Sequence, residues 1–148
     1  MHKALLLSLS ALLAATAAGG AQAKALKWMD GPPALPSGAK FAVVKGDPAK
    51  AGEFILRIKM PAGYAVPPHH HPADEIVRVR SGSLNYGMGD KLDKAAAGTL
   101  NPGYHVTMQA NMNHWVFTTA PAEVQVNGTG PFQIVYVNPA DDPRTAKK

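Results

Sequence analysis

Short apolar runs separated by turn residues fill most of the chain. From Lys40 onward, runs rich in Val, Ile, Phe and Tyr are separated by clusters of Gly, Pro, Asn and Asp. Phe54, Leu56, Ile58 and Met60 alternate with Ile55, Arg57 and Lys59, the period-two pattern of a strand with one buried face. A weak helical period at 91–97 supports one short turn of helix. The predicted strands are 40–44, 53–60, 75–80, 83–88, 104–109, 114–118, 123–126 and 132–137. The pattern therefore predicts an all-β sandwich or barrel.

The N-terminus has the pattern of a cleavable signal peptide over residues 1–23. Met1–Lys3 is short and basic, 4–18 is an uncharged Leu/Ala run, and Ala21-Gln22-Ala23 has the small-x-small form of a cleavage site. The alternative, a membrane anchor, needs about 20 apolar residues, and Gly19-Gly20 interrupts the run. We expect a mature protein beginning near Lys24, periplasmic or secreted, with no membrane association after cleavage.

The rest of the chain reads as one domain with a short arm and a tail. Residues 24–38 are Pro-rich and predict an extended N-terminal arm, residues 39–138 the β domain, and residues 139–148 a polar C-terminal tail. The 148 residues contain no cysteine, which excludes disulfides and a thiol nucleophile. The formal net charge is +5, but the basic residues are scattered, so nucleic acid is not an expected partner.

Three consecutive histidines carry the candidate chemistry. In an extended backbone His69 and His71 project to one face and His70 to the other, so two imidazoles can share a metal ion. Glu75 lies four residues further on, after a turn suited to bring its carboxylate back, and His114 offers a fourth ligand. Imidazoles with a carboxylate suit a divalent transition metal such as Fe, Mn, Ni, Cu or Zn. The alternative is a solvated polar loop.

The spacing of these residues resembles that of the cupin family. Gly63, His69, His71, Glu75 and Gly82 match the first cupin motif at every position and spacing. The resemblance implies a jelly roll, a double-stranded β-helix, with an ion held inside the barrel by the three histidines and Glu75. Further stretches, 32–36, 87–91 and 130–139, resemble small exported bacterial cupins of a single domain.

The second cupin motif is matched only in part. Gly103 and His114 fit it, whereas Gln109, Asn111 and Thr118 depart from it. The turn glycine of the motif can require a positive φ, and asparagine is the non-glycine residue that best tolerates this conformation. We therefore expect Asn111 to preserve the turn and the ligand set to survive.

The sequence leaves the roles of several side chains outside the ligand set open. By strand parity Trp115 and Phe117 face outward, opposite His114, which favours a homodimer; the alternative cover is the N-terminal arm. His105 is either a neighbour of the ligands or an outer-face residue. The methionines 88, 108 and 112 are either copper ligands or core residues.

The cupin resemblance leaves the activity open, because one fold supports many chemistries. We expect a metal-dependent enzyme acting on a small molecule, with oxygenase-type (dioxygenase-like) or isomerase-type chemistry, in which Glu75 is either a ligand or a catalytic base. One alternative is a non-catalytic module that binds or senses a metal or small ligand. Another is a structural barrel stabilised by its metal.

Overall fold

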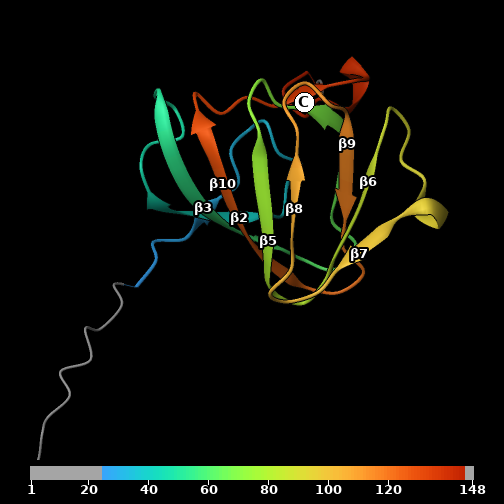
Figure 1. Ribbon diagram of the computed structural model, residues 1–148, viewed down its shortest axis with the longest axis horizontal. Coiled ribbons are helices and arrows are strands. Elements are labelled where there is room, and N and C mark those ends of the chain that lie inside the picture. Colours follow the sequence, from blue (N-terminus) through green and yellow to red (C-terminus); the bar gives the residue numbers. More distant parts are fainter. Residues whose placement is uncertain (1–24, 146–148) are drawn as a thin grey trace, which may run out of the picture.

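The computed structural model describes residues 25–145; the signal peptide predicted at 1–23 lies outside them. The regular secondary structure of the described residues is almost entirely β, in two antiparallel sheets (Figure 1). The first sheet has the order β1-β2-β3-β10-β5-β8 and the second β11-β4-β9-β6-β7. The elements are β1 Met29–Asp30, β2 Lys40–Lys45, β3 Gly52–Met60, β4 Ala65–His70, β5 Glu75–Ser81, β6 Leu84–Met88, η1 Lys94–Ala96, β7 Gly98–Leu100, β8 His105–Met108, β9 His114–Phe117, β10 Ala122–Gly130, β11 Val135–Tyr136 and η2 Pro139–Asp141.

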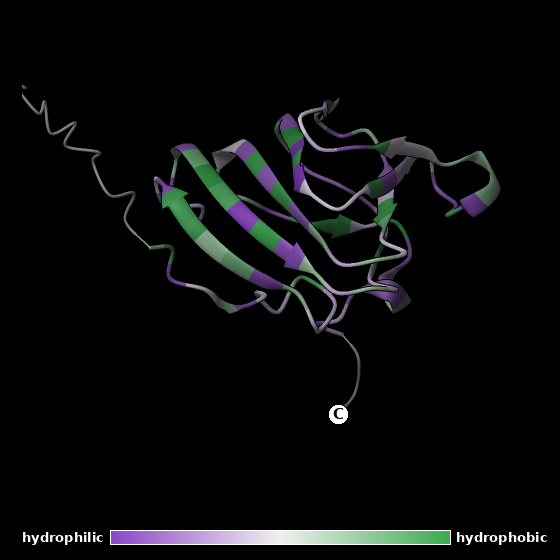
Figure 2. Ribbon diagram, turned by 90° about the horizontal axis from the view of Figure 1, so that it is seen from below, coloured by the Kyte–Doolittle hydropathy of each residue, from purple (hydrophilic) through white to green (hydrophobic). Residues whose placement is uncertain are grey.

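The two sheets enclose one apolar core. Bands of hydrophobic and hydrophilic residues alternate along the long strands, as Figure 2 shows, so each strand buries one face. On β5 the buried positions are Glu75, Val77 and Val79, whereas Arg80 is exposed. The period of two thus places Glu75 on the inner face of the sheet beside two valines.

Strand β4 was not predicted, because its sequence contains Pro67-Pro68. Proline lacks the N–H that a strand ladder needs. The register of β4 against β9 shifts between Val66 and His69, so the two prolines occupy a bulge where their missing donors are tolerated. The bulge leaves His69 paired with His114 across the two strands.

Several strands begin or end at other residues than the sequence predicted. The predicted arm contains the short strand β1, which pairs with β2. Strand β7 was missed, β10 extends through Gly128 to Gly130, and β11 is much shorter than the predicted strand 132–137. The helical turn expected at 91–97 is the short 3-10 helix η1. Local patterns fix the existence of a strand better than its ends, since pairing partners decide where the ladder stops.

Trp115 and Phe117 are not available for a partner subunit. They are 2% and 8% exposed within the single chain. The Trp115 indole lies against the backbone of Gly87, where an added Cβ would approach ring atom Cζ2 to 2.1 Å. The Lys94 amine lies 5.4 Å from the Phe117 ring centroid. The segment around β6 and η1 contacts these aromatics within the single chain, so their burial gives no support to a homodimer.

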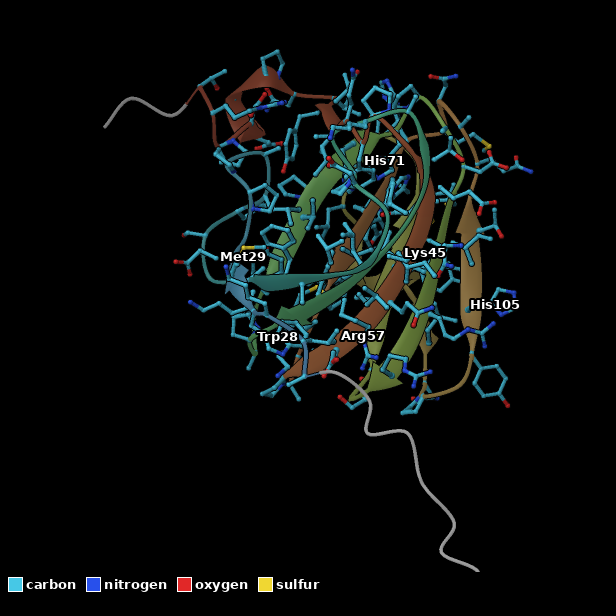
Figure 3. The ribbon with its side chains drawn as sticks, turned by 90° about the vertical axis from the view of Figure 1, so that its left-hand side faces the viewer. Trp28, Met29, Lys45, Arg57, His71 and His105 are labelled. Atoms are coloured by element: carbon cyan, nitrogen blue, oxygen red, sulfur yellow. The ribbon has the colours of Figure 1, made fainter. Side chains whose placement is uncertain are left out.

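The fold also places His105 and the three methionines, whose roles the sequence left undecided. His105 is exposed on the outer face of β8 and lies at the edge of the molecule in Figure 3. Met108 is a buried core residue, whereas Met88 and Met112 are each 45% exposed. Within residues 25–145, no helix is long and apolar enough to cross a membrane.

Candidate metal centre

Three imidazoles converge inside the barrel at one end of the core. His69 lies on β4, His114 begins β9, and His71 directly follows β4. All three are buried, at 4%, 1% and 3% exposure respectively. One ring nitrogen from each lies within 4.8 Å of the corresponding atoms of the other two. The fold thus brings together the three histidines that the sequence singled out.

Turn geometry helps to hold this arrangement. Asn111 has a φ of 61°, the left-handed conformation expected for it from the sequence. Its backbone N–H donates to the His71 carbonyl at 2.8 Å, so the turn before β9 is tied to the histidine segment. Gly82, a glycine of the first motif, has a φ of 69°, and a Cβ there would approach the Pro121 carbonyl oxygen to 2.3 Å. The Asn111 turn thus links the segment before His114 to His71, and Gly82 lets the turn after β5 approach the start of β10.

Each of the three rings is oriented by a backbone carbonyl at Nδ1. For His69, His71 and His114, in that order, the acceptors are the oxygens of Pro67 at 2.7 Å, Gln133 at 2.7 Å and Met112 at 2.9 Å. A carbonyl only accepts, so Nδ1 carries the proton and Nε2 of the neutral ring keeps its lone pair. Within residues 25–145, the buried Nε2 atoms of His71 and His114 have no hydrogen-bond partner. Converging, unpaired imidazole nitrogens are the donor set that a divalent transition metal requires.

Glu75 adds a carboxylate to the cluster. Its Oε2 lies 3.3 Å from Nε2 of His71 and 3.7 Å from Nε2 of His114. The side chain begins β5 in the opposite sheet and is only 8% exposed. Glu75 therefore lies within reach of an ion held by the histidines. His70 points away, because its Nδ1 lies 2.9 Å from the Asn113 side-chain oxygen.

The protonation states follow from burial and mutual charge. Burial lowers the pKa of His69 to about 3, with a further contribution from His114 and His71. Burial also lowers the pKa of His114, against the raising effect of Glu75. His71 is different: burial lowers its pKa, but the Glu75 carboxylate outweighs this and leaves the pKa raised. Burial would raise the pKa of Glu75, yet its net shift is downward because of His71. Without a metal, the Glu75 carboxylate therefore favours the protonated form of His71, and His71 favours the ionised form of Glu75.

A small apolar cavity adjoins the four polar side chains. Its volume is about 60 Å³, and Phe132 and Ile134 form part of its wall. This is room for about four water molecules. Beyond the polar end, its walls consist of aliphatic and aromatic side chains: Leu35, Ile58, Met60, Tyr64, Val66, Val77, Leu84, Val116, Val124, Val126, Phe132 and Ile134. Such a site excludes bulk water and admits a small, mostly apolar molecule.

Some residues that line the site were not predicted as site residues from the sequence. Phe132 stacks on His71 with ring centroids 4.7 Å apart, and the Tyr136 ring lies 5.9 Å from His69. Leu35, from the predicted arm, also lines the cavity. These residues are far from the histidine motifs along the sequence. No local spacing therefore links them to the histidines.

Solved structures with the same architecture include cupin proteins. A cupin superfamily protein from Desulfitobacterium hafniense matches with a TM-score of 0.53 and 11% identity, over 62% of this chain and 77% of that chain. A candidate acetylacetone dioxygenase from Methylibium petroleiphilum gives 0.63 and 18%, over 97% and 90%. The DMSP lyase DddQ from Ruegeria pomeroyi gives 0.61 and 23%, over 77% and 62%.

Neither a family model nor any curated protein sequence matches the chain. At such low identities, structural similarity establishes the architecture and leaves the activity open. The two antiparallel sheets, the near absence of helix and these structural neighbours agree with the fold implied by the motif spacing. The chain folds as a cupin jelly roll.

Proposed function

We propose that the protein is a metal-dependent cupin enzyme that acts on a small molecule by oxygenase-type or isomerase-type chemistry. The observation that carries this proposal is the convergence of three buried imidazoles whose Nδ1 atoms are all tied to backbone carbonyls. A divalent transition metal bound there would supply Lewis acidity or redox chemistry to a bound substrate. His69, His71 and His114 would hold it, with Glu75 as the fourth ligand.

The protein's own groups support turnover in two ways. The apolar cavity walls exclude water and lower the local dielectric, which strengthens every charge interaction at the polar end. Glu75 is ionised and buried, so its Oε2 is able to accept a proton from a substrate in the cavity. The similar proteins point the same way, since one is a candidate dioxygenase and another a lyase.

Metal content of purified variants tests the ligand set. His71→Ala and His114→Ala should each lose the metal, because each removes a converging Nε2. His70→Ala is the matched control: it has the same residue type one position away, but its ring contacts Asn113 instead. Equal metal content in all three variants would refute the proposed centre.

A conservative variant distinguishes between the two roles of Glu75, metal ligand and base. Glu75→Gln keeps the size and an oxygen donor but removes the negative charge. If Glu75 acts mainly as a base, the variant keeps its metal and loses turnover. If it acts mainly as a ligand, metal affinity falls as well. Substrate-dependent oxygen uptake by the metal-loaded protein would favour an oxygenase over the alternative, a binding or sensing module without turnover.

We also propose that the protein is exported to the periplasm or secreted, on the pattern of residues 1–23. N-terminal sequencing of the protein isolated from its native compartment should find a start near Lys24. Recovery of the intact N-terminus from that compartment would contradict signal cleavage.

A further inference from the structure

A short segment of the N-terminal arm is fastened across the metal cavity by two tyrosines. The Tyr64 hydroxyl donates to the Pro36 carbonyl at 2.8 Å, and the Tyr136 hydroxyl donates to the Ala34 carbonyl at 2.7 Å. Both tyrosines are buried, at 6% and 7% exposure. They come from distant parts of the chain, one just before β4 and the other on β11. The two bonds therefore fix the arm to the barrel on either side of one residue.

That residue is Leu35. It lies between the two anchored carbonyls and lines the same cavity as His69, His71 and His114. Its own N–H donates to the Pro32 carbonyl at 2.9 Å, which closes the segment 32–36 into a tight turn. The turn presents a single aliphatic side chain to the cavity.

An apolar groove lies on the other side of this turn. It has a volume of about 270 Å³, and Pro32 and Ala34 form part of its wall. Ile58, Phe132 and Ile134 line both this groove and the metal cavity. The segment 32–36 thus lies between a roomy outer groove and an inner cavity of about 60 Å³. Leu35 is the one residue of segment 32–36 that lines the inner cavity.

We propose that Leu35 is a specificity-determining residue of the metal site and that segment 32–36 is its lid, held by Tyr64 and Tyr136 as positioning residues. This inference rests on the proposed function. The lid restricts the site to a short aliphatic molecule with one oxygen-bearing end directed at the histidines, because the only charged or imidazole groups lining the cavity are at that end. Longer molecules meet the Leu35 side chain.

A series of linear carboxylates, from acetate to hexanoate, tests the size limit. Each is titrated into Co(II)-loaded protein, and binding is followed by the visible absorption of the ion. Each methylene that the cavity accommodates should strengthen binding about fourfold, until the chain length reaches the limit. Leu35→Ala removes three carbons, so the limit should move to longer carboxylates by two or three carbons. Leu92→Ala, the same truncation in the segment before η1 and outside the cavity, should keep the wild-type limit.

The outcomes separate the two proposals. An identical length profile for wild type and Leu35→Ala, with normal Co(II) binding, overturns the role of Leu35 and leaves the metal centre standing. Failure of the wild type to bind Co(II), or unchanged Co(II) binding in His114→Ala, overturns the proposed function itself. A limit that shifts equally in Leu92→Ala refutes a local effect at the lid.

The positioning role of the tyrosines has a kinetic readout. Tyr136→Phe and Tyr64→Phe each remove one hydrogen bond to the lid, so the lid should open more often. Removal of Co(II) by excess EDTA should accelerate about two- to tenfold in each variant, while the equilibrium affinity for Co(II) stays unchanged. Tyr86→Phe, which changes a tyrosine on β6 outside the lid, is the matched control.

A purely structural role for these tyrosines predicts a different result. Lower thermal stability with an unchanged EDTA rate would refute the lid. If either tyrosine variant fails to fold, the Leu35→Ala length profile decides the proposal, because Leu35 is only half-buried and its truncation leaves both tyrosine bonds possible.

Discussion

The pH dependence of metal affinity is the sharpest test of the protonation states in the cluster. Protons compete with a metal for the same imidazole nitrogens, so affinity falls as the pH falls. Three histidines with ordinary pKa values near 6.5 would each be about 97% protonated at pH 5. Each would then weaken binding about 30-fold between pH 8 and pH 5, and together about 3 × 10⁴-fold.

The structure predicts a much weaker dependence. His69, with a pKa of about 3, carries no proton at pH 5 and does not compete. His114 also has a lowered pKa, so it competes less than a free histidine. His71 has a raised pKa, because the Glu75 carboxylate favours its protonated form, so metal binding must displace a proton from this ring as the pH falls. The affinity is fully present above the raised pKa of His71 and declines as the pH falls through it.

The expected slope is therefore near one decade of affinity per pH unit between pH 5 and 6.5, and below two. Competition titrations against a chelator of known proton affinity measure it, for example with Zn(II) at half-unit pH steps. The heat of binding in buffers of different ionisation enthalpy gives the released protons independently. A slope near three would show that burial does not hold His69 and His114 neutral. Affinity independent of pH between 5 and 8 would refute histidine ligation altogether.

Three further predictions concern stability, measured as the free energy of unfolding in denaturant. Gly87→Ala should destabilise the fold by more than about 2 kcal/mol, because its Cβ would meet the Trp115 ring at 2.1 Å; a smaller loss would contradict the packing described. Asn111→Ala should cost about 1 kcal/mol and Asn111→Gly almost nothing, since the φ there is 61°; equal losses would refute this account. Thr118→Val should lower the free energy of unfolding by about 1–3 kcal/mol. The buried Thr118 hydroxyl donates to the Pro61 carbonyl at 2.6 Å and accepts from the Tyr64 N–H at 3.2 Å, and valine can do neither. Thr118→Ser keeps the hydroxyl and should recover most of the lost stability.

Strand patterning was sufficient to predict the all-β fold class and most of the strands, and motif spacing was sufficient to predict the convergence of the histidines. The alternation on β3 and β5 follows directly from the period of two, so inner and outer faces were readable residue by residue. Asn111 was predictable for a different reason: few residue types tolerate a positive φ, so an asparagine in place of glycine still indicates the turn. Both inferences depend only on local backbone physics.

Predictions of which segment covers the outer face of a strand were less accurate. Parity placed Trp115 opposite His114 correctly, but parity gives no information about the partner of that face. The cover comes from Gly87 and the segment around η1, whose sequence has little hydrophobic pattern. A glycine packs against an indole through backbone atoms, so its contribution leaves no apolar residue to detect. The homodimer inferred from these aromatics therefore stays a prediction, without support from their placement.

The ring-orienting contacts were also invisible in the sequence. The Nδ1 atoms of the histidines bond to carbonyls, and every residue has a carbonyl whatever its side chain. Gln133, for example, orients His71 through its backbone alone. Tertiary placement of the chain decides such contacts, whereas composition and spacing do not.

The position of the ligands in the two sheets couples the chemistry of the site to the stability of the fold. Glu75 belongs to the sheet that contains β5, whereas His69 and His114 belong to the sheet that contains β4 and β9. Burying these groups without partners is unfavourable, and the unpaired Nε2 of His114 is one place where this remains uncompensated. A metal bound to all four side chains would satisfy these atoms and link the two sheets. Because it would bind only the folded chain tightly, a free concentration 1,000 times Kd would add about 4 kcal/mol to the free energy of unfolding. The same four side chains that make the site reactive would then also hold the jelly roll closed.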